Sequence, residues 1–243
     1  MILKTDNYSF WCKCNKISKR HYVYYIGNTD GKPIPCISIS VDKFDQWYMT
    51  IQDLEYYPTC SFEPMERGKG TIEMVQGAIK AICKKHPKIR VIAFQDCSYW
   101  TTQNKEKISL PEFRLLAKGK TWYEKHFGAT PSDNRIQGLV ERYKNIRKKK
   151  VKDTKLNNVY NGYSELTIAN LLKVLVEINE LTEQGFKEIL RSLYLDVIAH
   201  NAWHIPVAST ESFIFQGRFL ESDDQYGGYH MYEPTTYKFN IWR

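Results

Sequence analysis

Hydrophobic and polar residues alternate along much of the first sixty residues, which is the pattern of β-strands. From Ile37 to Val41 every second residue is apolar and the two residues between are serines, so the strand predicted at 35–44 has one apolar and one polar face. Residues 21–26 and 46–57 are rich in aromatic and β-branched side chains, which favour strands. The pattern predicts an antiparallel meander in this region.

The period then changes. From Ile72 to Ile82 the apolar residues recur at steps of three and four, which marks one face of a helix. Residues 65–81 are therefore expected to begin as a turn and continue as a helix, and residues 90–95 (RVIAFQ) have the length and composition of a strand. Because strand, turn, helix and strand in this order need a crossover, the strand at 90–95 should lie parallel to the strand that enters the turn. The expected fold class is α+β, a mixed and mostly antiparallel sheet with helices packed on it.

Two shorter helices and one basic helix are expected next. Residues 110–117 have an apolar side, with Ser109 as a candidate N-cap and Gly119 as the residue that ends the helix. Thr121 is a candidate N-cap for the following helix. Apolar residues at helical spacing within 139–146 predict an amphipathic helix that leads into a charged segment.

The region 164–200 carries the clearest helical pattern. Apolar residues at helical spacing begin after Ser164 and again after Thr182, and the second series reaches Ile198. Two helices joined in this way form an αα-hairpin. Residues 201–243 are instead rich in aromatic residues and glycine, and so many large apolar side chains are expected to dock on the rest of the chain or on a neighbouring chain.

These shifts in pattern and composition divide the chain into four parts. A boundary is expected wherever the periodicity or the charge changes over a few residues. The expected parts are a sheet and helix domain at 1–131, a basic helix or linker at 132–155, a helical hairpin at 156–200 and an aromatic docking tail at 201–243.

Composition is that of an ordinary globular protein. Of the 243 residues, 42% are apolar and 26% are charged. The formal net charge is +8, which favours an acidic partner such as CoA phosphates, nucleic acid or an acidic protein surface. No apolar run approaches the length of a membrane span, and no secretory signal is visible, so a cytoplasmic, nuclear or virion location is expected and secretion is not. The six cysteines lack zinc-type spacing, so reduced thiols and no metal site are expected.

The turn before the first helix is a candidate anion site. Gly68 and Gly70 alternate with the basic residues Arg67 and Lys69. The first N–H groups of a helix have no intrahelical partner, and glycine lets the backbone approach a phosphate closely. A plain turn is the alternative interpretation, because Glu73 stands where the third glycine of a dinucleotide-binding motif would be.

A second stretch adds a resemblance. Residues 118–129 read KGKTWYEKHFGA and contain Tyr123-Glu124-Lys125 in a predicted helix. The turn, helix and strand followed by this helix resemble the acetyl-CoA-binding half of the GNAT N-acetyltransferase superfamily over about residues 20–131. The same block is similar to uncharacterised proteins of large double-stranded DNA viruses, which would place the protein in an infected cell or in a virus particle.

The resemblance implies direct attack of an amine on the thioester of acetyl-CoA. Such a reaction needs positioned reactants, a base for the amine, stabilisation of the oxyanion and a proton for the leaving thiolate. Two sets of site residues are implied: cofactor-binding Arg67, Gly68, Lys69, Gly70 and Thr71, and catalytic Tyr123 and Glu63. Further candidates are the carboxylates of Glu55 and Asp96 and the imidazole of His126. Core packing is the alternative role for Tyr123, and an exposed charge on a strand is the alternative for Glu63.

Two other functions remain open. Met65 stands where the family turn carries Gln or Arg, and Phe127-Gly128 reverses the usual order, which favours a catalytically inactive, structural or assembly component of a large DNA virus particle. Residues 142–155 carry eight basic residues and one acidic residue, which favours an association with nucleic acid or an acidic surface. A solvated helix end is the simpler interpretation of that segment.

Overall fold

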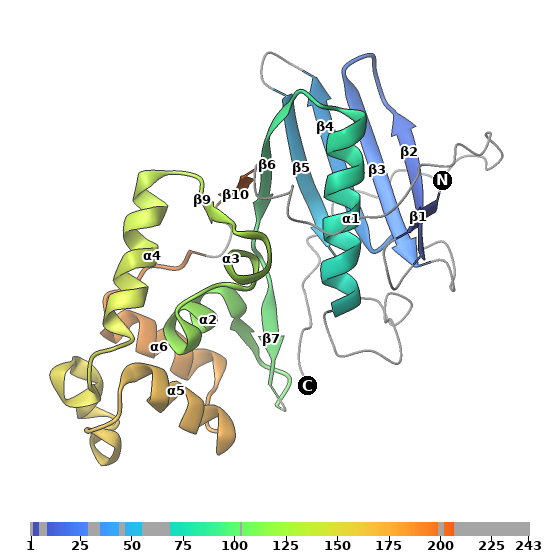
Figure 1. The fold of residues 1–243 in the computed structure, drawn as a ribbon. Helices are drawn as coiled ribbons and strands as arrows, with labels where there is room; N and C mark the ends of the chain where they lie inside the picture. The colour runs from blue at the N-terminus through green and yellow to red at the C-terminus, as the bar shows by residue number, and fades with distance from the viewer. Residues whose placement is uncertain are drawn as a thin grey trace. The chain divides into compact units, whose positions relative to one another are not determined.

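The computed structural model describes residues 2–4, 9–28, 35–43, 47–54, 69–102, 104–198 and 202–206. The chain forms two compact units, of which the first runs to Phe94 and the second from Gln95 to His204. The fold is mixed α+β, with a mostly antiparallel sheet and several helices, as the sequence predicts (Figure 1). The contacts between residues thus divide the chain after Phe94, whereas the sequence pattern predicts that the first part ends at residue 131.

Six strands of the first unit form one sheet in sequence order. Neighbouring strands from β1 to β5 are antiparallel, and β5 and β6 are parallel. The predicted meander is confirmed, and so is the parallel arrangement between the strand at 90–95 and the last described strand before the helix. The bounds are β1 Ile2–Lys4, β2 Ser9–Lys16, β3 His21–Asn28, β4 Ile37–Lys43, β5 Trp47–Leu54 and β6 Ile89–Gln95.

One helix, α1 (Lys69–Lys85), crosses a face of this sheet (Figure 1). Its buried side includes Val75 and Ile79, which belong to the apolar series seen in the sequence. The sheet face beneath α1 includes Tyr24 and Ile39, neighbours in the β3–β4 register, and both are fully buried. The burial of apolar surface between helix and sheet builds the core of this unit.

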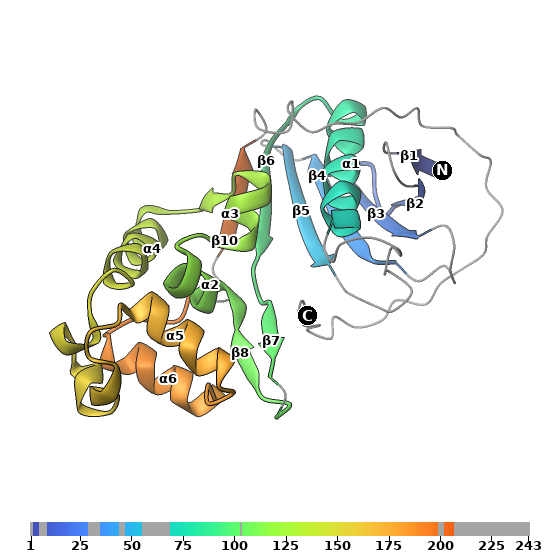
Figure 2. The same ribbon diagram turned by 60° about the horizontal axis from the view of Figure 1, so that its bottom comes forward.

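The second unit is organised around a helix buried along nearly its whole length. Every residue of α2 from Leu110 to Ala117 is buried, including two charged residues. Helices α4 and α5 contact α2, and both views show them beside it (Figures 1 and 2). The bounds are α2 Leu110–Lys118, α3 Trp122–Phe127, α4 Asn134–Ile146, α5 Ile168–Glu177 and α6 Glu183–Ser192.

Short elements complete this unit. Strands β7 and β8 form an antiparallel hairpin, and β9 pairs antiparallel with β10. Three 3-10 turns link α4 to α5. The bounds are β7 Tyr99–Thr101, β8 Lys107–Ser109, β9 Thr130–Pro131, β10 Ala202–Pro206, η2 Val151–Asp153, η3 Lys155–Asn158 and η4 Asn161–Tyr163.

Most of the predicted helix ends are confirmed. Ser109 occupies the N-cap position of α2 but its side chain makes no capping hydrogen bond, and Gly119 ends that helix in the left-handed region at φ 77°. Thr121 caps α3 through a capping box with Glu124. The basic helix is α4, and its buried residues include Tyr143.

The helical hairpin differs from the prediction at two ends. Thr167, not Ser164, caps α5, because Val151 N–H donates to the carbonyl of Leu166 and holds the preceding backbone out of the helix. Helix α6 stops at Ser192 rather than continuing to Ile198. Tyr194 has a φ of 55°, and the N–H of Leu195 donates to the Leu190 carbonyl, which is a Schellman-type end.

One expectation about the cysteines is wrong. Cys36 is disulfide-bonded. Cysteine spacing did not reveal this bond because a disulfide depends on which cysteines meet in space. Cys12, Cys14, Cys83 and Cys97 are free thiols. Within the described part of the chain, no helix is both long enough and apolar enough to cross a membrane.

Candidate functional site

The sequence-predicted site residues are only partly described. Glu63, Arg67 and Gly68 lie outside the described residues, as does Glu55. Lys69 opens α1, but its side chain is not among those described. Gly70 and Thr71 lie in the first turn of α1 in the first unit, and Tyr123 lies in α3 of the second unit.

The start of α1 lies at a defined end of the sheet. The helix has 17 residues and is about 26 Å long at 1.5 Å per residue. Only residues 86–88 connect it to β6, whose seven residues span about 23 Å. The helix therefore returns antiparallel to β6, and its N-terminus lies at the end of the sheet where β5 and β6 terminate (Figure 1). No acidic residue occupies the first turn, so the positive end of the helix dipole is not neutralised from within that turn.

At this same end β5 carries a bulge and extends past its pairing with β6. Ser38 of β4 faces Asp53, but Ile39 faces Ile51, so Gln52 is an extra residue in β5. The parallel register of β5 with β6 ends at Ile51 and Phe94, whereas β5 itself runs to Leu54. Beyond that pair, no described residue pairs with the β6 side of the β5 backbone.

Tyr123 is almost fully buried, with 6% of its surface exposed. Its ring lies 5.0 Å from the Trp122 ring and 5.9 Å from the Phe127 ring, so packing holds the side chain in place. Burial first, and then the charges of Asp96 and Cys97, raise the pKa of Tyr123 well above its ordinary value. The phenol is therefore a proton donor that stays protonated at neutral pH.

Asp96 is a second buried group of the same unit. Its Oδ1 accepts from the Ser98 N–H at 3.1 Å and from the Ser98 hydroxyl at 2.5 Å. Burial raises the pKa of Asp96 to about 6; its two hydrogen bonds and the Arg114 charge lower it, while Glu112 raises it further. A carboxyl group with this pKa is suited to proton transfer near neutral pH, and its charge is one of the causes that raise the pKa of Tyr123.

The first unit contains a polar pair that the sequence analysis missed. His86 follows α1, and its Nε2 lies 2.6 Å from the Tyr24 hydroxyl. Burial, followed by the charges of Lys43 and Lys85, lowers the pKa of His86 to about 4, so the imidazole is neutral and can accept a hydrogen bond from the Tyr24 hydroxyl. The signal that could have found it is a histidine one residue beyond a helix, opposite a tyrosine on the apolar face of a strand.

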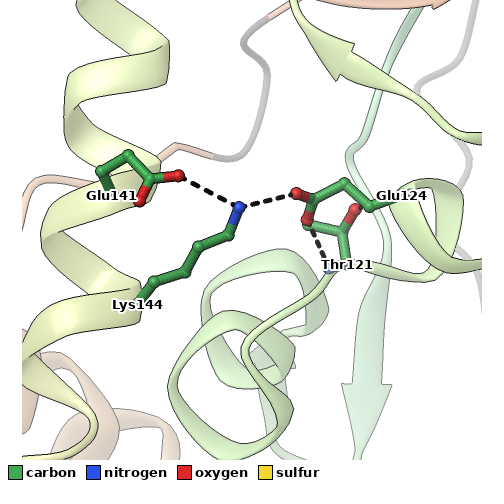
Figure 3. A network of polar contacts seen from close by, with 4 residues as sticks. All are labelled: Thr121, Glu124, Glu141 and Lys144. Atoms are coloured by element: carbon green, nitrogen blue, oxygen red, sulfur yellow. Dashed lines mark hydrogen bonds and ion pairs between the residues drawn. The ribbon is translucent and has the colours of Figure 1, made fainter.

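The second unit also has a cavity of about 410 Å³ between α3, β9 and α4. Figure 3 shows its charged side, where Lys144 lies between two carboxylates. The Lys144 ammonium is 3.1 Å from Glu124 Oε1 and 3.2 Å from Glu141 Oε1. Glu124 Oε2 also accepts from the Thr121 N–H at 2.7 Å, so the capping box of α3 fixes one wall of the cavity.

The basic segment 142–155 is largely occupied by contacts within its own unit. Arg147 donates to the carbonyls of Leu116 and Ala117 at the end of α2, and Arg142 donates to the Tyr194 carbonyl. Its other basic side chains differ in their contacts: Lys144 pairs with Glu124 and Glu141, Lys150 and Lys152 pair with Glu165, Lys155 lies over the Tyr194 ring, and Lys148 and Lys149 are exposed. Most of this charge is thus already used to hold the fold together.

The described residues offer no obvious metal centre. No three His, Cys, Asp or Glu side chains among them form a group that could hold a metal ion. The chemical groups available in the described regions include phenol, carboxyl, imidazole, thiol, guanidinium and ammonium groups, and a helix N-terminus beside a parallel strand pair. A scan against protein-family models and searches of curated proteins and of solved structures found no match to this chain.

Proposed function

We propose that the chain is a GNAT-like acyltransferase that transfers an acetyl group from acetyl-CoA to an amine. The observation that supports this most is the β5–α1–β6 crossover, in which the helix N-terminus and the bulged end of β5 lie at the same edge of the sheet. Ligands of open sheets bind beyond the carboxyl ends of parallel strands. The resemblance of residues 20–131 to the acetyltransferases points to the same place.

Both halves of an acetyl-CoA molecule have suitable partners there. The pyrophosphate would accept hydrogen bonds from the N–H groups of Gly68 to Thr71, with positive charge from Arg67 and Lys69. The pantetheine arm carries two amide groups, and it would run along the backbone of β5 beyond Ile51. The thioester would then lie near the bulge at Gln52.

The proposed chemistry needs one base and one acid. Glu63, by resemblance, would take a proton from the attacking amine. Tyr123, also by resemblance, would give a proton to the leaving CoA thiolate. Asp96 is an alternative base because burial brings its pKa to about 6.

Calorimetry with acetyl-CoA tests the binding site. The unmodified chain should bind, and Gly70→Asp should weaken binding at least tenfold, because its carboxylate would repel the pyrophosphate and fill the space of the backbone approach. Gly162→Asp is the matched control, since a Cβ at Gly162 meets nothing within 4 Å and the added charge is the same. Absence of binding by the unmodified chain, or equal affinities of both variants, would rule out the site.

A turnover assay separates an enzyme from an inactive scaffold of the same fold. Release of free CoA thiol in the presence of a panel of amines should be detectable, and Tyr123→Phe should lower it about a hundredfold with acetyl-CoA affinity unchanged. Binding without turnover for every amine would instead support the inactive assembly component.

A further inference from the structure

We propose that the cavity between α3, β9 and α4 is a binding site for a small organic monocation, an alkylammonium or alkylguanidinium group on a short aliphatic chain. It is lined by Glu124, Ala129, Thr130, Pro131, Gln137, Val140, Glu141 and Lys144. This site lies within the second unit and does not depend on the proposed acetyl transfer.

The charge balance of the site selects a cation. Glu124 and Glu141 carry two negative charges and Lys144 one positive charge, so the cavity wall has a net charge of −1 in a protein of formal charge +8. Lys144 already demonstrates the geometry, because its ammonium fits between the two carboxylates at 3.1 and 3.2 Å (Figure 3). Burial opposes the Lys144 charge, but the hydrogen bonds and charges of both carboxylates outweigh it and raise the pKa of Lys144.

Acceptors remain for a second cation. Lys144 contacts Oε1 of Glu141, whose side chain is 56% exposed and lines the cavity, and its Oε2 is a further acceptor. Gln137 lies one helical turn earlier on the same face of α4 and is exposed, so its amide oxygen is a second acceptor on that wall. Within the described residues, neither Oε2 of Glu141 nor the Gln137 amide is engaged elsewhere.

The rest of the cavity sets the size and polarity of the ligand. Val140 and Ala129 are buried with 1% and 4% exposure, and together with Pro131 they give the cavity an apolar floor that suits a short aliphatic chain. A volume of about 410 Å³ lies near the lower end of small-molecule sites, which are about 300–1,000 Å³. An anion of the same size would be repelled by the two carboxylates, and the positive charge of Lys144 is already paired with them.

Nuclear magnetic resonance titration of the full chain with n-butylammonium and n-butylguanidinium tests the proposal. Saturable shifts are expected at residues 124, 137, 141 and 144 with both cations, and none with butyrate or 1-butanol at matched ionic strength. Shifts of equal size with butyrate, or no saturable shift with either cation, would overturn it.

Three substitutions sharpen the test. Glu141→Gln should weaken n-butylammonium binding about fivefold or more, because it removes a charged acceptor. Glu165→Gln is the matched control, an exposed glutamate of the same unit that pairs with Lys150 and Lys152 and does not line the cavity, and it should leave affinity unchanged. Lys144→Met should tighten binding about fivefold, because the ligand then takes the place of the internal ammonium between Glu124 and Glu141. Equal affinities for Glu141→Gln and Glu165→Gln, or weaker binding by Lys144→Met, would contradict the proposal.

Discussion

The two units of this protein keep their polar groups in different places. In the first unit, α1 covers a sheet face whose side chains alternate along each strand, and the covered face is almost entirely apolar or aromatic. In the second unit, α2 is buried on all sides and carries Glu112 and Arg114 into the interior. The comparison shows that a helix surrounded by other elements needs internal polar partners, whereas a helix packed on one sheet face can leave its polar side in water.

Each unit also buries a titratable group, and the two respond oppositely to acid. His86 in the first unit is held neutral, with its pKa lowered to about 4. Asp96 in the second unit has its pKa raised to about 6. Burial is the first cause in both cases, because a low-dielectric interior disfavours the charged form of either group. Stability should therefore depend on pH with opposite signs in the two units.

Removing the Glu112 carboxylate should have the largest effect. Its side chain is 0% exposed, its Oε1 accepts from the Ile198 N–H at 2.6 Å, and its Oε2 accepts from the Ser109 hydroxyl. Glu112→Ala leaves these donors buried without their acceptor and opens a cavity, so the free energy of unfolding should fall by about 3 kcal/mol or more. Denaturant unfolding measures it.

Two further variants show whether the loss belongs to this network. Glu112→Gln keeps an acceptor for the Ile198 N–H and a donor for Ser109, so it should lose less than Glu112→Ala. Glu188→Ala removes an exposed glutamate of α6 and should change stability by no more than about 0.5 kcal/mol. A Glu112→Ala variant as stable as Glu188→Ala would show that the interior of the second unit tolerates the loss of its charge.

Acid should destabilise the first unit through His86. Its folded pKa of about 4 lies below the ordinary 6.5, so between these values the unfolded chain binds more protons. The free energy contributed by neutral His86 is fully present above pH 6.5 and is lost as pH falls towards 4, on the order of 3 kcal/mol in total. In His86→Gln this pH dependence should vanish from unfolding curves recorded between pH 4 and 7.

Tyr24→Phe tests the cause of that dependence. The variant removes the 2.6 Å hydrogen bond but keeps His86 buried beside Lys43 and Lys85. Because burial is the largest cause of the shift, the acid sensitivity should persist in this variant at a lower overall stability. A flat pH profile in Tyr24→Phe would mean that the hydrogen bond, and not burial, holds the imidazole neutral.

Asp96 should act in the opposite direction. Its folded pKa of about 6 exceeds the ordinary 3.8, so between pH 4 and 6 the folded chain binds more protons. The contribution of Asp96 to stability is present below pH 4 and is lost as pH rises through 6, by about 2 to 3 kcal/mol. Asp96→Asn keeps an acceptor for Ser98, so it should lack this slope and be more stable than the unmodified chain at pH 7. An Asp96→Asn variant less stable at pH 7 would show that attraction to Arg114 outweighs burial.

The contrast between the units also explains what the sequence could predict. Alternation from Ile37 to Val41 was enough to predict a strand, but it did not reveal that both faces of β4 are buried there, including Ser38 and Ser40. Helix starts were predictable where a cap is local, as at Thr121. The start of α5 was not, because the bond from Val151 to the carbonyl of Leu166 keeps the backbone extended until Thr167. Such a bond connects residues far apart in sequence and leaves no trace in the local pattern.

The candidate site shows the same limit. Glycines before a helix pointed to the α1 N-terminus, and topology then placed that terminus beside the ends of β5 and β6. Glu112 looked like part of a local helix start, but its partner Ile198 lies 86 residues away. His86 and Tyr24 are separated by 62 residues, so only the packing of α1 on the sheet brings them together. Buried polar pairs of this kind depend on tertiary contacts that residue spacing does not encode.

The smallest predicted effect concerns the cap that borders the cavity. Thr121 accepts from the Glu124 N–H at 3.1 Å, and its own N–H donates to the Glu124 carboxylate. Thr121→Ala removes one of these two bonds at a buried helix start and should lower the free energy of unfolding by about 1 kcal/mol. Thr121→Ser keeps the hydroxyl and should lose only a few tenths of that. The cavity gives a second readout, because Glu124 still pairs with Lys144 when the threonine hydroxyl is gone. If Thr121→Ala abolished the shifts that n-butylammonium causes at residues 137 and 141 while costing only about 1 kcal/mol, the capping box would be a support for the site rather than only the start of a helix.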